Sequence, residues 1–307
     1  MSSLPPDVLG LGSATIDDIL YIDHFPQVDT KQQAQRAERF GGGLTATALV
    51  AVARLGKRAV FAGRMGRDDA SRWVVDDLAR DGVDVSAVVY DEAARPIQAW
   101  IMVEPPPRST RTILYTVPEI HGAHPSLPDA DLICSARCLM VDDFGLTGHI
   151  RAARLARAVG IPVVGDFERL QTPGLADLLG LVDHLIVSQR FALALTGAAT
   201  PGEAALALFK SAPDRALACV TAGDTGSWYT TNGIILEHQS AFPVEAVDTT
   251  GCGDVFHGAY MVALIDGLPM QQRIRFAAAA AAIKATRTGG RMGIPTRAAV
   301  EALMAST

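Results

Sequence analysis

The sequence lacks any long hydrophobic run. Although 49% of its 307 residues are hydrophobic, no apolar stretch approaches the ~20 residues that a membrane-spanning helix needs. The first residues, Met1 to Pro6, also lack the basic start and apolar centre of a signal peptide. These two absences predict a cytoplasmic protein without a membrane partner.

Cysteine and clustered positive charge are also scarce. There are four cysteines, and the spacing from Cys134 to Cys138 fits neither a redox pair nor a zinc site, so we expect reduced thiols. The formal net charge is −6 and no basic cluster is present, which argues against nucleic acid as a partner. The sequence therefore predicts a small-molecule ligand.

Two common nucleotide-binding motifs are incomplete. Gly56-Lys57 is followed by Arg58, and no glycine stands five residues before Gly56, so the chain has no Walker A sequence. Gly10 and Gly12 follow a short apolar strand, but Thr15 stands where a dinucleotide-binding turn needs its third glycine. An NAD-dependent oxidoreductase is therefore a weak alternative, which a test of NADH binding would decide.

The most informative stretch is a glycine-interrupted turn at 247–258, which leads into an apolar helix that we expect to continue to about Asp266. Gly251 and Gly253 permit close backbone approach, and a helix start presents unpaired N–H groups and a positive dipole end. Such a turn binds anions. A carboxylate there, Asp254, is best explained as a base that takes a proton from a hydroxyl attacking a phosphoryl group. The alternative is an ordinary helix cap.

The residues of this turn, Asp248-Thr249-Thr250-Gly251-Cys252-Gly253-Asp254, resemble the C-terminal signature Asp-Thr-x-Gly-Ala-Gly-Asp of the ribokinase-like (PfkB) sugar kinases. The resemblance extends over nearly the whole chain. It implies that Asp254 is the catalytic base and that the amides of Gly251, Cys252 and Gly253 form the anion hole. It also implies ATP as the phosphoryl donor and Mg²⁺ bridging the phosphates.

A second resemblance lies in the N-terminal part. The run from Gly41 to Ala48, before an alanine-rich helix, is similar to the family's N-terminal signature. It implies that Gly42, Gly43 and Thr47 contact the sugar, with Thr47 in place of the usual Asn. Asp17 and Asp143 would be further sugar contacts. The alternatives are turn and cap roles for these residues.

Several residues are expected near the nucleotide. The resemblance implies that Arg111 touches its phosphates, as in ketohexokinases; the alternative is a solvated strand residue. Thr221, Gly223 and Gly226 resemble a loop that contacts ATP, although a hairpin is the alternative, because Asn232-Gly233 between 228–230 and 234–236 is a strong hairpin signal. Ser188 is a further expected ATP contact. It begins the residues Ser-Gln-Arg-Phe that stand where the family carries Asn-x-x-Glu.

The resemblance also implies sites for metal ions. Asp166, which follows the strand predicted at 161–164, corresponds to an acid near Mg²⁺ and the phosphates. Asp248, Thr250, Arg287 and Gly289 belong to a region that can hold a monovalent cation such as K⁺ through backbone carbonyls in this family.

Alternating strand and helix patterns from 139 onward predict a parallel sheet with flanking helices. The resemblance implies one ribokinase-like domain over 1–307, with three α/β/α layers, a mainly parallel central sheet and a small β-rich lid from about 18–40 and 96–117. Within the lid, 97–103 and 111–115 predict a hairpin joined by the proline-rich stretch 104–109. Such lids often pair two subunits, so a homodimer is expected.

The sequence thus predicts an ATP-dependent kinase that phosphorylates a primary hydroxyl of a small neutral sugar, a ketose in the first place, nearest the ketohexokinase and sulfofructose kinase branch. Three alternatives stay open. The substrate is a nucleoside; or it is an anionic sugar such as sulfofructose or a phosphosugar, for which Lys31 is a candidate contact; or the protein is a sugar- and nucleotide-binding regulator without turnover, against which the intact Asp254 argues.

Overall fold

The computed structural model describes residues 4–104 and 110–306, and of Arg111 the backbone alone. Its main feature is an eight-stranded sheet with the order β14-β13-β12-β11-β10-β9-β1-β4, in which every neighbouring pair from β4 to β12 is parallel. The strands β13 and β14 add an antiparallel edge. The bounds are β1 Val8–Gly10, β4 Ala59–Phe61, β9 Cys138–Val141, β10 Val163–Gly165, β11 His184–Ser188, β12 Leu217–Thr221, β13 Ser227–Thr230 and β14 Glu237–Gln239.

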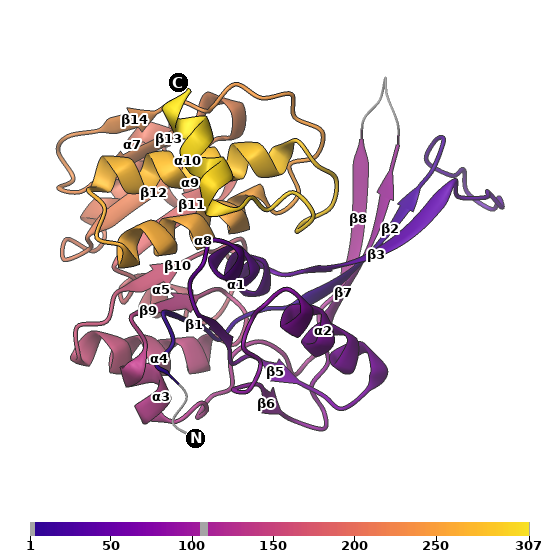
Figure 1. Cartoon of the computed structure of the whole chain (residues 1–307), viewed down its shortest axis with the longest axis horizontal. Coiled ribbons are helices and arrows are strands. Elements are labelled where there is room, and N and C mark those ends of the chain that lie inside the picture. The colour runs from indigo at the N-terminus through magenta and orange to yellow at the C-terminus, as the bar shows by residue number, and fades with distance from the viewer. Residues whose placement is uncertain (1–3, 105–109, 307) are drawn as a thin grey trace.

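Helices cover both faces of this sheet, because successive strand residues point to opposite sides. Cys138 and Met140 belong to a core shared with α1, α8 and α9, whereas Leu139 and Val141 belong to a core shared with α3 to α7. The helices are α1 Leu44–Arg54, α2 Asp69–Arg80, α3 Ala130–Ser135, α4 Leu146–Ala158, α5 Leu175–Leu179, α6 Gln189–Thr196, α7 Pro201–Lys210, α8 Cys252–Ile265, α9 Met270–Ala285 and α10 Arg297–Ala305. The predicted three-layer α/β/α architecture is confirmed (Figure 1).

A second, four-stranded sheet with the order β3-β2-β7-β8 projects from the body of the protein, as Figure 1 shows, and forms the β-rich lid. Its strands are β2 Thr15–Tyr21, β3 Arg36–Gly42, β7 Ile97–Val103 and β8 Arg111–Thr116. The central strands β2 and β7 pair in parallel, and the outer pairs are antiparallel. Residues 105–109 of the predicted proline-rich connection lie outside the described residues. A small parallel pair, β5 Arg64–Met65 with β6 Val89–Tyr90, completes the sheets described.

One strand prediction was wrong in position. We expected Ile234 to Leu236 to form the second strand of the Asn232-Gly233 hairpin, but β14 begins at Glu237. The reason is a side-chain turn: Asn232 Oδ1 accepts hydrogen bonds from the backbone N–H groups of Ile234 and Ile235, at 2.9 and 2.8 Å. These two residues are therefore held in the turn and are exposed.

Two apolar helices start at the glycine turns that the sequence singled out. The helix α1 follows Gly43, and α8 follows Gly251. They meet in the core where Gly258 of α8 lies against Ala48 of α1: a Cβ added at Gly258 would lie 2.4 Å from the Ala48 carbonyl oxygen. Gly258 thus permits backbone contact between the two helices. Within the described residues, no single helix is long and apolar enough to cross a bilayer; α6 and α7, a bent pair, meet those criteria only together.

Candidate active site

Candidate residues gather at the carboxyl ends of the parallel strands, which is where open α/β sheets bind ligands. Asp143 follows β9, Asp166 follows β10, and Ser188 and Thr221 end β11 and β12. Asp254 lies in the first turn of α8, and the charges of Asp166 and Glu168 contribute to its raised pKa. The sheet therefore assembles groups that are far apart in the sequence.

The catalytic turn has the backbone that its glycines predict. Gly251 is the N-cap of α8 in the left-handed region, with φ +76°, which a residue with a Cβ adopts only with strain. The Cys252 N–H donates to the carbonyl oxygen of Thr249 at 3.2 Å, so this amide is engaged within the turn. A Cβ at Gly253 would meet no described atom within 4 Å. Of the three expected anion-hole residues, Gly251 and Gly253 are therefore the better candidates.

Asp254 lies among other acids. Its burial, and then the charges of Asp166, Glu168 and Asp17, raise the pKa of Asp254 well above its usual value, against an opposing effect of Arg291. A carboxylate with a raised pKa accepts a proton more readily, which suits a general base. Perturbed carboxyl groups at a glycine turn therefore make this the strongest catalytic candidate in the described structure.

Two acids, Asp166 and Glu168, form the adjacent part of the cluster. Burial, and then the charges of Glu168, Asp143 and Asp142, raise the pKa of Asp166. Loss of solvation, and then the charges of Asp143 and Asp142, raise the pKa of Glu168. Oδ2 of Asp166 also lies 3.3 Å from Nδ1 of His257. No group of three or more His, Cys, Asp or Glu in the described residues could hold a metal ion alone. Two carboxylates do fit Mg²⁺, which prefers oxygen ligands and takes most of them from water and phosphates.

The expected sugar contacts other than Asp143 lie close together. Asp17 Oδ1 accepts a hydrogen bond from Thr15 Oγ1 at 2.8 Å, and a Cβ at Gly42 would lie 2.3 Å from Asp17 Oδ2. Burial raises the pKa of Asp17. Gly43 caps α1 with φ +96°, and Thr47, one turn along that helix, is buried. These residues form one polar wall at the start of α1, and the charge of Asp17 contributes to the raised pKa of Asp254.

The sequence interpretation missed Arg291, whose guanidinium joins three parts of the site. It donates from Nη1 to Asp77 Oδ2 at 2.8 Å, from Nη2 to the Gly42 carbonyl oxygen at 2.9 Å, and from Nε to Thr47 Oγ1 at 3.4 Å. Only 4% of its surface is exposed, and a lone buried charge is costly, so these partners explain its position. No local pattern in the sequence signals this role, because its partners come from distant segments.

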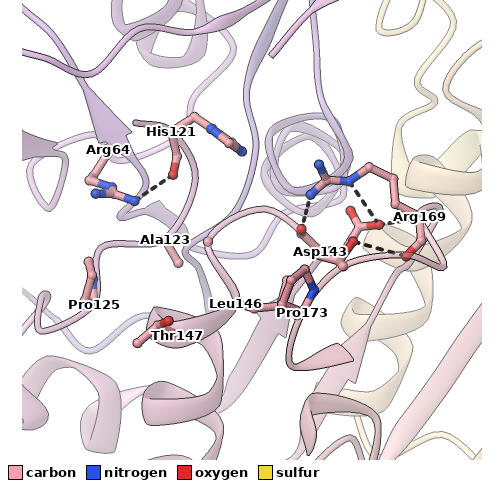
Figure 2. Close-up of a pocket in the computed structure, with 11 residues that line it drawn as sticks. Arg64, His121, Ala123, Pro125, Asp143, Leu146, Thr147, Arg169 and Pro173 are labelled. Atoms are coloured by element: carbon pink, nitrogen blue, oxygen red, sulfur yellow. Dashed lines mark hydrogen bonds and ion pairs between the residues drawn. The ribbon is translucent and has the colours of Figure 1, made fainter. Parts of the chain in front are cut away.

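Asp143, the remaining expected sugar contact, lines a pocket of about 270 Å³ together with Arg64 and Arg169 (Figure 2). Its Oδ2 accepts from the N–H groups of Glu168 and Arg169, and the Arg169 guanidinium also stacks 3.8 Å from the centre of the Phe144 ring. On the other side of the pocket, Arg64 donates to the carbonyl oxygen of His121 at 2.9 Å. Oδ1 of Asp143 is buried without a hydrogen-bond partner, so it can accept one from a ligand.

The neighbouring Asp142 has a structural role. Its Oδ2 accepts from the Ser13 N–H, Ser13 Oγ and Thr45 Oγ1, and its Oδ1 accepts from the Phe144 N–H and contacts Nε2 of His149. Burial acts to raise the pKa of Asp142, but these partners outweigh burial and lower it. This carboxylate therefore stays charged and ties the strand ends together.

The expected nucleotide contacts are spread over three elements. Ser188 caps α6 by accepting from the Phe191 N–H at 3.2 Å, and Thr221 Oγ1 donates to the Val187 carbonyl oxygen at 3.4 Å. Gly223 and Gly226 have φ values of +61° and +95° and frame a short 3₁₀ turn between the antiparallel strands β12 and β13. This turn precedes the one at Asn232-Gly233 on which the alternative interpretation is based. Arg111 lies in β8, and its side chain is outside the described residues.

The region expected to hold a monovalent cation already contains a protein cation. Asp248 accepts the N–H groups of Thr250 and Gly289 on its carboxylate, each at 2.8 Å, and Nζ of Lys284 donates to its backbone carbonyl at 2.8 Å. Burial acts to raise the pKa of Asp248, but Thr250, Lys284 and Gly289 outweigh burial and lower it. Arg287 follows α9 and is exposed. An ammonium on the Asp248 carbonyl does not fit with a metal cation at the same oxygen, because the two charges repel.

Comparisons with known proteins bear on this site. The model of the pfkB family carbohydrate kinases matches residues 6–297. The ribokinase of Haemophilus influenzae is 28% identical, over 94% of each chain. Fructokinase-1 of Oryza sativa subsp. japonica is 29% identical, over 86% of this chain and 88% of the relative. The structure of Arabidopsis thaliana ribokinase complexed with ribose and ATP has a TM-score of 0.86 and 25% identity, over 98% of this chain and 99% of that chain.

The family match covers almost the whole chain, and it includes both glycine turns and the acid at the start of α8. The curated relatives agree with it over nearly their full lengths. The chain belongs to the pfkB family of carbohydrate kinases.

Proposed function

We propose that this kinase transfers the γ-phosphate of ATP to a primary hydroxyl of a small neutral sugar, with Asp254 as the base. The observation that carries the proposal is the space at Gly253. This glycine has no described neighbour within 4 Å of a built Cβ, and its φ is not positive, so neither packing nor backbone conformation requires a glycine there. A ligand that approaches the start of α8 does require one.

The residues around this space supply the chemistry of phosphoryl transfer. Asp254 takes the proton of the attacking hydroxyl, and the Gly251 and Gly253 amides stabilise charge on the transferred group. The polar wall of Asp17, Gly42 and Gly43 orients the sugar, while Arg291 fixes the Gly42 carbonyl and the Thr47 hydroxyl. The charge of Asp17 contributes to the raised pKa of Asp254, which supports a sugar hydroxyl held near both carboxyl groups.

The ATP and metal assignments rest on residues at the same sheet edge. We assign Thr221, Gly223 and Gly226, with Ser188 and Arg111, to the nucleotide, which the ATP complex of the Arabidopsis ribokinase supports. Mg²⁺, when bound, neutralises phosphate charge. Asp166 and Glu168 would hold it, and their raised pKa values support a place for a cation. Glu168 then supplies the acid that the absent Asn-x-x-Glu motif leaves out.

The proposal extends to the class of sugar that the kinase phosphorylates. We propose a ketose, which the fructokinases among the relatives support, with a pentose such as ribose or a nucleoside as the rival. An anionic sugar would find Arg64 and Arg169 at the Asp143 pocket. Asp143 already pairs with Arg169, at 3.5 Å between Oδ2 and Nε, and so offsets that charge. This pairing favours a neutral substrate.

We further propose that two copies pair through the lid. Trp100 and Leu114 are cross-strand partners in the lid and are 40% and 58% exposed, which is unusual for two large apolar side chains on one face of a sheet. A second copy of the same sheet is the partner with a matching surface. Light scattering should give twice the chain mass, and Leu114→Lys should give the monomer. A wild type that is monomeric at micromolar concentration would contradict this.

The proposed reaction is tested by ATP consumption against a panel of ketoses, aldoses, nucleosides and phosphosugars, with the product's phosphorylated carbon assigned by NMR. Asp254→Asn should bind Mg·ATP normally and lose ~10²–10⁴-fold in turnover, because the amide keeps the shape but cannot take the proton. Asp214→Asn, on an exposed position, is the matched control. Near-normal turnover by Asp254→Asn would remove Asp254 from its role.

A further inference from the structure

Lys284, in the last turn of α9, is completely buried. The alanines at 277 and 280, on the same face of the helix, are buried as well. Lysine is among the residues that are least often buried, and a buried ammonium needs close polar partners. A lysine within an alanine-rich core helix therefore requires an explanation in terms of what its Nζ contacts.

The Nζ atom contacts the start of the catalytic turn. It donates to the backbone carbonyl of Asp248 at 2.8 Å. The next residue of α9, Ala285, accepts the N–H groups of Val247 and Asp248 on its own carbonyl, at 2.8 and 3.0 Å. The end of α9 and the entry to the turn are thus tied by three hydrogen bonds. Asp248 extends this set of contacts, because its carboxylate accepts hydrogen bonds from the N–H groups of Thr250 and Gly289.

The end of α9 also supports Gly251, whose amide is proposed to bind the transferred phosphate. A Cβ at Gly251 would lie 2.6 Å from the carbonyl oxygen of Gly290, so the turn rests directly on the loop that follows α9. A Cβ at Gly293 would lie 2.6 Å from the carbonyl oxygen of Lys284, so this loop in turn packs on the helix end. A shift at Lys284 would therefore move Gly251, and with it the groups proposed to bind the transferred phosphate.

We propose that the Lys284 ammonium is a built-in cation that replaces a monovalent metal ion beside the catalytic turn. A metal ion at this place would need the Asp248 carbonyl, and the ammonium already occupies that oxygen and repels a second positive charge. Lys284 is then a positioning residue, and turnover by this kinase is independent of K⁺. The inference rests on the catalytic role proposed for the turn at 248–254.

The first experiment uses the unmodified protein. Turnover and melting temperature are measured in KCl, NaCl and choline chloride at equal ionic strength, with Mg·ATP and the best sugar of the panel. We expect the same values in the three salts. Activation by K⁺, or a rise in melting temperature specific to K⁺, would overturn the proposal. The melting series needs no substrate, so it decides the matter even if no sugar in the panel is phosphorylated.

Two variants then test the ammonium itself. Lys284→Met keeps the volume and removes the charge, and should lose turnover by about 10²-fold in choline chloride, since small misplacement of reacting groups has effects of this size. Lys284→Ala also opens space, so K⁺ or methylammonium should restore part of its turnover and raise its melting temperature. Lys210→Met, at an exposed lysine, is the control. A folded Lys284→Ala that is fully active in choline chloride and unaffected by K⁺ would refute the positioning role.

Discussion

Replacing Arg291 by methionine should destabilise the protein and weaken sugar binding together. The side chain is buried, and its three hydrogen bonds go to Asp77, the Gly42 carbonyl and Thr47. Removing one partner of a buried ion pair costs about 3–5 kcal/mol of unfolding free energy. We expect the lower end of that range, because Asp77 is partly exposed and keeps a contact with Arg80 at 3.1 Å.

The assay for Arg291→Met combines urea unfolding with steady-state kinetics. KM for the sugar should rise while KM for ATP stays unchanged, because the lost contacts hold Gly42 and Thr47 and not the nucleotide loop. Arg297→Met is the matched control: its guanidinium pairs with Asp266 and Glu301 but is 37% exposed, so it should cost only about 0–1 kcal/mol. Equal unfolding free energies for the two variants would refute the reasoning, as would an unchanged KM for the sugar.

Three further predictions follow from the site. The acid limb of kcat/KM should lie above the ordinary carboxyl value of 3.8, because burial and then the charge of Asp166 raise the pKa of Asp254. The base works only when it is ionised, so activity is lost as the pH falls through the raised pKa. An acid limb at an ordinary carboxyl pKa would contradict this. Cys252→Ala should keep turnover, because the turn uses the backbone N–H of this residue, and an inactive variant would point to a chemical role for the thiol. Lys31→Ala, at an exposed residue, should leave the order of sugar preference unchanged, and loss of a preference for an anionic sugar would show the neutral-sugar proposal to be wrong.

The fold was largely predictable because its signals are local. Short apolar runs between helical patterns gave the parallel strands, and the glycines at 251 and 253 gave the start of α8. The strand predicted at Ile234 was misplaced because the Asn232 side chain accepts hydrogen bonds from two backbone N–H groups. In a strand, these groups would pair with a neighbouring strand. Competition of this kind depends on geometry that residue type alone does not decide.

The site was predictable only where function rests on a continuous motif. Asp254 and Gly42 stand in such motifs, whereas Arg291 acquires its role from Asp77 and Thr47 on two other helices. Glu168 left a weak signal, since it is a second acid two residues after Asp166. Lys284 also left a weak signal, because it is a charged residue at the helical spacing of the buried alanines of α9.

The absence of a side chain at Gly258 has a mechanical consequence. Because α8 there touches the backbone of α1, the two helices cannot separate without losing this contact, and the turns at Gly43 and Gly251 are the starts of these two helices. This contact in the core therefore fixes the distance between the two turns, and with it the distance between the proposed sugar contacts and the proposed anion hole. We expect any closing movement over a substrate to come from the sheet of β2, β3, β7 and β8, because it projects from the body and has a small core of its own around Ile19, Ala99 and Ile101.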